Sequence, residues 1–224
     1  MAGRTLCGAR SRWCHCAGRR RLSWPPDMKA RAAARAAVLL SLSAGFAQAH
    51  TIVEGIGGFS GGVMHPLLVP AHVLALVALG CLTGALNFRA RLVVIAMFVA
   101  VAVLSVVLVT MAFSAVNAEL IVLSLAGFAG LLLAAAVPVP LAMIIVLAIC
   151  VAAALTFDSV PAVLSSQDTI LSLVGTILAA ALLLVVITFL SASGPQVWRR
   201  IGTRILGSWI AASAIMVLAL RWTA

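Results

Sequence analysis

Two histidines, His65 and His72, lie seven residues apart in a segment, residues 57–80, that is otherwise apolar enough to enter a lipid bilayer. An ionisable side chain inside a membrane span is costly and usually faces the bundle interior or a water-filled cavity. Neutral imidazole is also the commonest metal ligand in proteins. In a continuous helix this spacing places both imidazoles on one face, with His72 about 10 Å deeper than His65. The pair therefore indicates a metal-ion site, although a hydrogen bond to a neighbouring carbonyl would explain His72 equally well.

The same segment contains Gly58-x-Ser60-x-Gly62, a pattern that surrounds the nucleophilic serine of many hydrolases. That chemistry needs a sharp strand-to-helix turn, and no strand is expected before Ser60. A rhomboid-like intramembrane protease is similar in helix number, but it needs a histidine on a later helix, and none follows His72. We therefore expect no enzymatic activity, and we interpret the glycines as a bent start of the first helix or as points of close backbone approach.

The composition is that of a polytopic membrane protein. Hydrophobic residues make up 64% of the chain and charged residues only 9%, and the mean hydropathy is +1.23. Because the backbone of each span must satisfy its hydrogen bonds internally, the apolar runs predict helices. We expect an all-α, six-helix transmembrane bundle with helices at roughly 66–86, 92–113, 120–137, 141–157, 169–190 and 201–220.

The N-terminal part of the chain differs from the rest. Residues 1–49 hold nine of the fifteen Lys and Arg residues, so most of the net charge of +10 lies there rather than on a surface that would bind nucleic acid. Residues 28–49 read as a signal peptide with a basic start, a short apolar stretch and a cleavage site of small residues. Residues 1–27 have no periodicity and are interpreted as an extension from an over-long gene start, with Met28 as the initiator. Residues 50–224 form the expected membrane domain.

The arginines of the membrane domain predict its orientation. Two loops carry most of them, with Arg89 and Arg91 in one and Arg199 and Arg200 in the other. The positive-inside rule places both loops in the cytoplasm, and a cleaved signal peptide independently places the mature N-terminus outside. The orientation is then N-outside and C-outside. The acids of this domain and two of its histidines would lie on the outer side: His50, Glu54, His65, Glu119, Asp158 and Asp168.

The acids differ in what their positions suggest. Glu119 and Asp168 each precede an apolar run, where a carboxylate favours a helix N-terminus. Asp158 ends the fourth run and opens a loop, which favours a solvated acid over a ligand. The candidate metal ligands or pathway residues are His65 and His72, the strongest pair, with His50, Glu54 and Asp158.

The order of signal peptide, His50 at the mature N-terminus, the segment 57–80 and a six-helix body resembles the HupE/UreJ family of bacterial membrane proteins. The first-helix pattern of that family is matched by Gly58-Phe59, His65-Pro66, His72, Leu74-Ala75 and Gly80, and residues 204–220 are similar to its final helix. Two features depart from it. The aspartate expected before the second histidine is Ala71 here, and a second histidine-rich motif has no counterpart, since the corresponding segment holds only Asp158.

This resemblance implies a secondary transporter or facilitator of a divalent transition-metal ion, with nickel or cobalt as cargo and no required cofactor. It also implies the bacterial inner membrane as location, the lipid bilayer as environment and metalloenzyme maturation proteins as partners. No nucleotide-binding motif is present, so transport would depend on gradients or on a metal-binding partner. The alternative is a non-transporting accessory or assembly protein for a metalloenzyme or another membrane complex.

Overall fold

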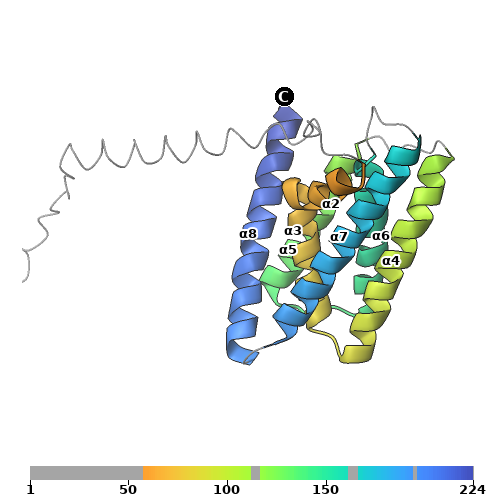
Figure 1. The fold of residues 1–224 in the computed structure, drawn as a ribbon. Helices are drawn as coiled ribbons and strands as arrows, with labels where there is room; N and C mark the ends of the chain where they lie inside the picture. Colours follow the sequence, from red (N-terminus) through yellow and green to blue (C-terminus); the bar gives the residue numbers. More distant parts are fainter. Residues whose placement is uncertain (1–57, 112–116, 161–165, 194–195, 224) are drawn as a thin grey trace, which may run out of the picture. The chain divides into compact units, whose positions relative to one another are not determined.

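The computed structural model describes residues 58–111, 117–160, 166–193 and 196–223, and within these ranges it contains helices and no strands. Figure 1 shows the arrangement of these helices: α2 (Gly58–Leu68), α3 (Pro70–Gly84), α4 (Phe88–Thr110), α5 (Ala118–Ala135), α6 (Leu141–Asp158), α7 (Ser166–Ala192) and α8 (Gln196–Thr223). Helices α4 to α8 are each long and apolar enough to span a bilayer, and the bent pair α2 and α3 makes a sixth candidate. The expected all-α polytopic membrane fold is confirmed.

Helix α3 forms the centre of the bundle. It packs against each of the helices α4 to α8, which surround it. Its side chains Leu76 and Leu79 are completely buried, and the small buried residues Ala75 and Ala78 let the neighbouring helices approach closely. The outer helices turn many large apolar side chains away from this core, as expected of surfaces in contact with lipid. Ala71 and His72, near the start of α3, are buried among these helices.

The expectation of one continuous first helix over residues 66–86 is wrong. The chain breaks at Val69, whose backbone is extended (φ −88°, ψ 109°), and the axes of α2 and α3 differ by 69°. The cause is Pro70, because a proline ring disfavours helical backbone at the residue before it while fitting well at the first position of a new helix. Helix α3 has 15 residues, so its length of about 22 Å falls short of the hydrocarbon core of about 30 Å.

Helix α2 is held against α7 by close backbone contacts. A side chain at Gly62 would overlap the backbone of Ser172, and one at Gly175 would overlap the carbonyl oxygen of Phe59. The Thr176 hydroxyl also donates a hydrogen bond to the Gly62 carbonyl oxygen at 3.0 Å. The interpretation of the glycines as points of close approach is thus correct for Gly62. Ser60, however, lies inside α2 rather than before the first helix.

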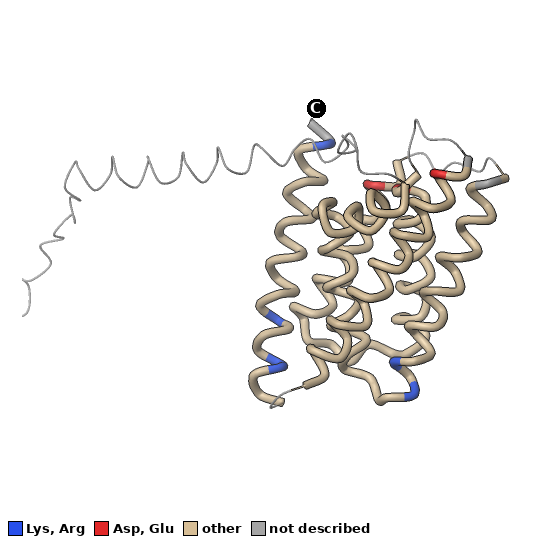
Figure 2. The backbone as a smooth tube through the Cα atoms, in the orientation of Figure 1, with Lys and Arg blue, Asp and Glu red and all other residues tan. Residues whose placement is uncertain are grey.

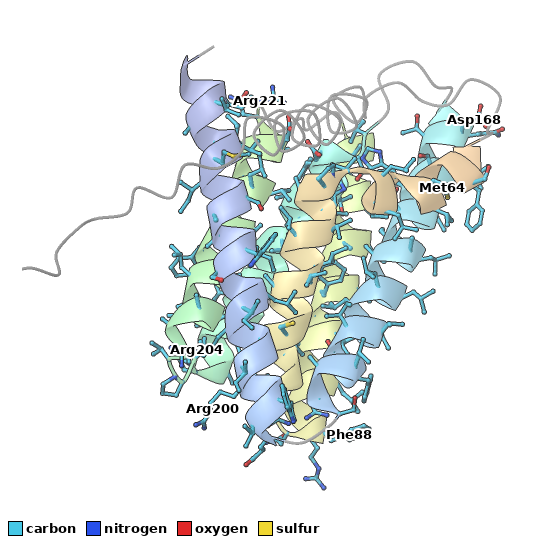
Figure 3. All side chains as sticks on the ribbon, turned by 90° about the vertical axis from the view of Figure 1, so that its left-hand side faces the viewer. Met64, Phe88, Asp168, Arg200, Arg204 and Arg221 are labelled. Atoms are coloured by element: carbon cyan, nitrogen blue, oxygen red, sulfur yellow. The ribbon has the colours of Figure 1, made fainter. Side chains whose placement is uncertain are left out.

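Charged residues divide between the two ends of the bundle, as Figure 2 shows. The arginine end carries Arg89 and Arg91 at the start of α4 and Arg199 and Arg200 at the start of α8. The opposite end, called the acidic end below, carries Glu119 and Asp168 in the first turns of α5 and α7 and Asp158 at the end of α6. Figure 3 labels Asp168 and Arg221 at this end and Arg200 and Arg204 at the other. This division is the one from which the orientation was predicted.

Candidate metal site

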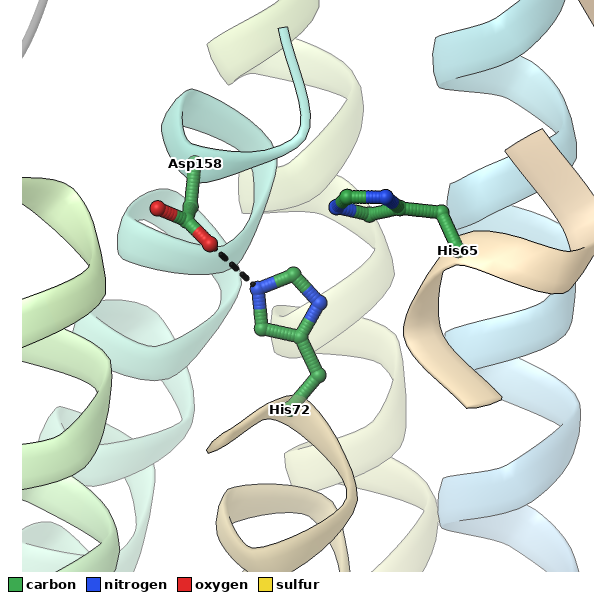
Figure 4. Close-up of side chains that lie close together, drawn as sticks. All are labelled: His65, His72 and Asp158. Carbon is green, nitrogen blue, oxygen red and sulfur yellow. Dashed lines mark hydrogen bonds and ion pairs between the residues drawn. The ribbon is translucent and has the colours of Figure 1, made fainter. Parts of the chain in front are cut away.

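Three potential ligands from three helices meet near the acidic end. His65 lies in the last turn of α2, His72 in the first turn of α3, and Asp158 is the last residue of α6. One ligand atom from each residue can be chosen so that all three lie within 4.8 Å of one another. Figure 4 shows the His65 ring reaching from α2 toward the space beside His72 and Asp158.

His72 is fixed by the carboxylate. Its imidazole is completely buried, and its Nε2 atom lies 2.9 Å from Oδ2 of Asp158, whose side chain is only 11% exposed. The Nδ1 atom of His72 is also buried and has no hydrogen-bond partner among the residues that the structure describes. The carboxylate thus holds the buried ring through one nitrogen. The interpretation of Asp158 as a solvated loop acid is wrong, because α6 continues through this residue and its largely buried side chain is bound to His72.

The break between α2 and α3 brings the two histidines together. Their ring centroids are 5.1 Å apart and the rings are tilted by 66°. A depth difference of about 10 Å, expected for a continuous helix, is therefore wrong. Because α2 bends away at Val69, His65 comes back beside His72 instead of standing two turns above it. The bend converts a spacing along one helix into a direct contact between two helices.

The distances suit a transition-metal ion after small side-chain adjustments. Histidine nitrogens and carboxylate oxygens bind such an ion at about 2.0–2.2 Å, so adjacent ligands at right angles are about 3.0 Å apart and opposite ligands about 4.2 Å. The 2.9 Å between His72 and Asp158 corresponds to adjacent ligands. The limit of 4.8 Å for the set exceeds the opposite-ligand distance by about half an ångström, a difference that side-chain rotation can close.

The other two candidate ligands and the two acids expected at helix N-termini remain to be placed. His50 and Glu54 lie outside the described residues. Glu119 instead accepts two hydrogen bonds from the Arg221 guanidinium, both at 2.9 Å, and thereby pairs with the arginine nearest the C-terminus. Asp168 lies in the first turn of α7, the position expected of a carboxylate that favours a helix N-terminus.

Comparison with protein families matches residues 38–217 to the family described as HupE / UreJ protein. The chain belongs to the HupE/UreJ family. No curated protein and no solved structure shows significant similarity to it. In this HupE/UreJ protein, Ala71 occupies the position where an aspartate was expected, and it is buried in the first turn of α3. The carboxylate next to His72 comes instead from Asp158, on a different helix.

The position of Asp158 beside the two histidines was not predicted from the sequence. A position at the end of an apolar run does not distinguish a carboxylate that turns outward from one that turns toward the bundle. One signal was available, because Asp158 falls at the same membrane depth as the start of the histidine helix when the six runs are threaded alternately through the bilayer. The HupE/UreJ pattern gave no further help, since its matches lie near the histidines and in residues 204–220 and do not include Asp158.

Proposed function

We propose that this HupE/UreJ protein is a secondary transporter or facilitator for a divalent transition-metal ion of the nickel and cobalt type. The observation that carries the proposal is the cluster of His65, His72 and Asp158, whose ligand atoms lie within 4.8 Å of one another. Two imidazoles and one carboxylate suit borderline divalent ions, and the absence of a thiolate from this set disfavours soft ions such as Cu(I).

Three protein ligands suit an ion that must be released again. A transport site has to bind its ion well enough to admit it and weakly enough to let it leave. Four-coordinate structural zinc sites, by contrast, are closed by four protein ligands. With His65, His72 and Asp158 as the set, water would complete the coordination and could be exchanged as the ion moves. His65 is partly buried and His72 completely so, which gives the ion an order of contact from His65 to His72.

The direction of transport follows from the orientation. The cluster lies toward the acidic end, and the positive-inside rule assigns the arginine end to the cytoplasm. An ion would therefore enter from the outer face, with His50 and Glu54 as further candidate residues on its way. Below His72 the buried face of α3 presents Ala75, Leu76 and Leu79, which offer no ligand. Passage to the cytoplasm then requires the helices around α3 to move, and the protein would work in the bacterial inner membrane by alternating access rather than as an open pore.

The experiment is metal uptake by purified protein in lipid vesicles, with a fluorescent indicator for nickel or cobalt inside. The double variant His65→Ala, His72→Ala should abolish uptake. Glu119→Gln is the matched control, because it removes an acid from the same end without touching the cluster, and its uptake should equal that of the unchanged protein. Unchanged nickel, cobalt, copper and zinc uptake in the double histidine variant would refute the proposed site.

The same measurement separates transport from the accessory function. An accessory protein for a metalloenzyme would bind a partner through the histidine helices and would give no uptake in vesicles that contain it alone. In cells, loss of the gene would then reduce metalloenzyme activity without changing total nickel or cobalt. Neighbouring genes give a further criterion, since metalloenzyme maturation genes favour metal delivery and an unrelated oxidase operon favours assembly.

A further inference from the structure

A cavity of about 570 Å³ lies at the arginine end, far along α3 from the histidine cluster. Its wall is formed by the last turn of α3, the end of α5 with the connection to α6, and the beginning of α8. It is partly open, and its size falls within the range of about 300–1,000 Å³ typical of small-molecule sites. The metal proposal makes no use of this cavity.

The cavity combines an apolar wall with two arginines. Leu82, Leu86, Leu132 and Val139 are among its apolar residues, and Arg199 and Arg200 line it from the first turn of α8. None of the described residues lining it is acidic. This combination fits a molecule that has both a negative group and a hydrocarbon portion.

Both arginine side chains have guanidinium N–H donors that remain available to a ligand. Arg199 donates from Nη1 to the carbonyl oxygen of Ala192 at 3.3 Å, and neither Arg199 nor Arg200 forms an ion pair with a residue that the structure describes. Arg91, at the same end, differs because it donates to the carbonyl oxygens of Leu86 and Gly84 and so braces the turn between α3 and α4. Adjacent guanidinium groups with free donors are well suited to a phosphate.

The position of the cavity corresponds to the membrane interface. Trp198, next to Arg199, is 73% exposed, and exposed tryptophans are enriched at the level of the lipid headgroups. From there the cavity extends inward to Cys81 and Ile144, within the apolar parts of α3 and α6. A ligand held here would have its charged part beside the arginines and its apolar part deeper among the helices.

We propose that this cavity binds an anionic phospholipid, such as phosphatidylglycerol, of the cytoplasmic leaflet. Arg199 and Arg200 hold the phosphate, and the leucines of α3 and α5 contact the acyl chains. Basic pockets between helices on the cytoplasmic side are known places for such headgroups. A soluble phosphate compound would leave the apolar wall exposed to water, so the lining favours the lipid. Two arginines would repel a divalent cation, and the site is accordingly separate from the proposed metal route.

The test is native mass spectrometry of the purified full chain with added lipid. Phosphatidylglycerol should remain bound more strongly than zwitterionic phosphatidylethanolamine. The double variant Arg199→Gln, Arg200→Gln should weaken phosphatidylglycerol binding by about 30-fold. This figure assigns to each arginine the binding free energy that is typical of one basic residue near an anionic membrane surface and adds the two. Arg89→Gln is the matched control, because it removes an exposed arginine of the same end that does not line the cavity, and it should bind lipid unchanged.

A second variant and a soluble anion complete the experiment. Ala85→Trp adds bulk in the cavity wall without changing any charge, and it should also prevent lipid retention. This variant tests the proposal independently if the double arginine variant fails to fold. Glycerol 3-phosphate, which has the charged group but no acyl chain, should not displace the lipid at equal concentration. Equal retention of the two lipids, full retention by Ala85→Trp, or displacement by glycerol 3-phosphate would each overturn the proposal.

Discussion

Gly62 in α2 and Ser172 in α7 are in direct backbone contact, and a Cβ atom at Gly62 would overlap the carbonyl group of Ser172. His65 lies three residues after Gly62 on the same short helix. The position of His65, one of the candidate ligands, therefore depends on how closely the backbone of α2 approaches the backbone of α7. A substitution at Gly62 tests whether this packing positions the site, without changing any of the three candidate ligands.

Gly62→Ala should displace α2 from α7 and move His65 away from His72 and Asp158. Overpacking of a close contact costs about 1–3 kcal/mol, which the bundle can relieve by releasing α2 while the other helices remain packed. We expect nickel or cobalt uptake to fall by at least about tenfold, in line with an affinity loss of 1.4 kcal/mol or more, while the protein still purifies as a folded membrane protein.

Gly202→Ala is the matched control for this substitution. Gly202 lies in α8, and a Cβ atom there would meet no other atom within 4 Å. The same change of one methyl group should leave uptake unchanged and stabilise α8 slightly, because alanine favours a helix over glycine. Equal losses of uptake in both variants would contradict the link between the α2–α7 contact and His65.

The membrane-spanning helices could be predicted because the lipid bilayer imposes one simple requirement on the sequence. Each run of about 20 apolar residues must form a helix, and the observed helices α4 to α8 contain the expected runs almost entirely. Most of these helices begin before the expected run, as α8 (Gln196–Thr223) does, because an arginine that ends an apolar run does not end a helix, whereas α4 and α5 end slightly before theirs. Hydropathy locates the part of each helix that lies in the apolar core of the bilayer. The residues at which a helix begins and ends depend on local backbone geometry instead.

The histidine geometry could not be predicted from spacing alone. A periodicity argument assumes an unbroken helix, and Val69 interrupts it between His65 and His72. Pro70 was visible in the sequence, but a proline within an apolar run can begin a helix, kink one or be accommodated. Only the packing of α2 across α7 decides between these outcomes, and that packing depends on contacts between residues more than a hundred positions apart, such as Thr176 with Gly62.

Asp158→Asn should separate the structural contribution of this side chain from its charge. Asparagine can keep a hydrogen bond to the buried His72 ring, so the thermal stability should change little. Metal affinity should fall by at least about tenfold, comparable to the loss of a supporting group in other metal sites, because a neutral amide replaces the only carboxylate in the cluster. The measurement is isothermal titration with nickel and cobalt. An unchanged affinity would show that Asp158 only orients His72.

The orientation predicts which end of the bundle reacts with a membrane-impermeant maleimide. In a variant whose five native cysteines are replaced by alanine, a single cysteine at Phe88, exposed at the arginine end, should react only in inverted membrane vesicles. A single cysteine at Gln167, exposed at the acidic end, should react in intact cells. The reverse pattern would place the histidine cluster toward the cytoplasm and would reverse the proposed direction of metal entry.

Two threonines of α7 should respond oppositely to the same substitution. Thr188 is completely buried, and its hydroxyl has no hydrogen-bond partner among the described residues, so Thr188→Val removes an unsatisfied group while nearly preserving the shape of the side chain. Relief of such a group should stabilise the folded protein by about 1 kcal/mol. Thr176→Val instead removes the hydrogen bond to the Gly62 carbonyl oxygen and should destabilise it by about 0.6 kcal/mol. Unfolding of both variants in detergent measures these changes in stability. Of the two threonines, only Thr176 contacts α2. Metal uptake should therefore decline in Thr176→Val and remain normal in Thr188→Val.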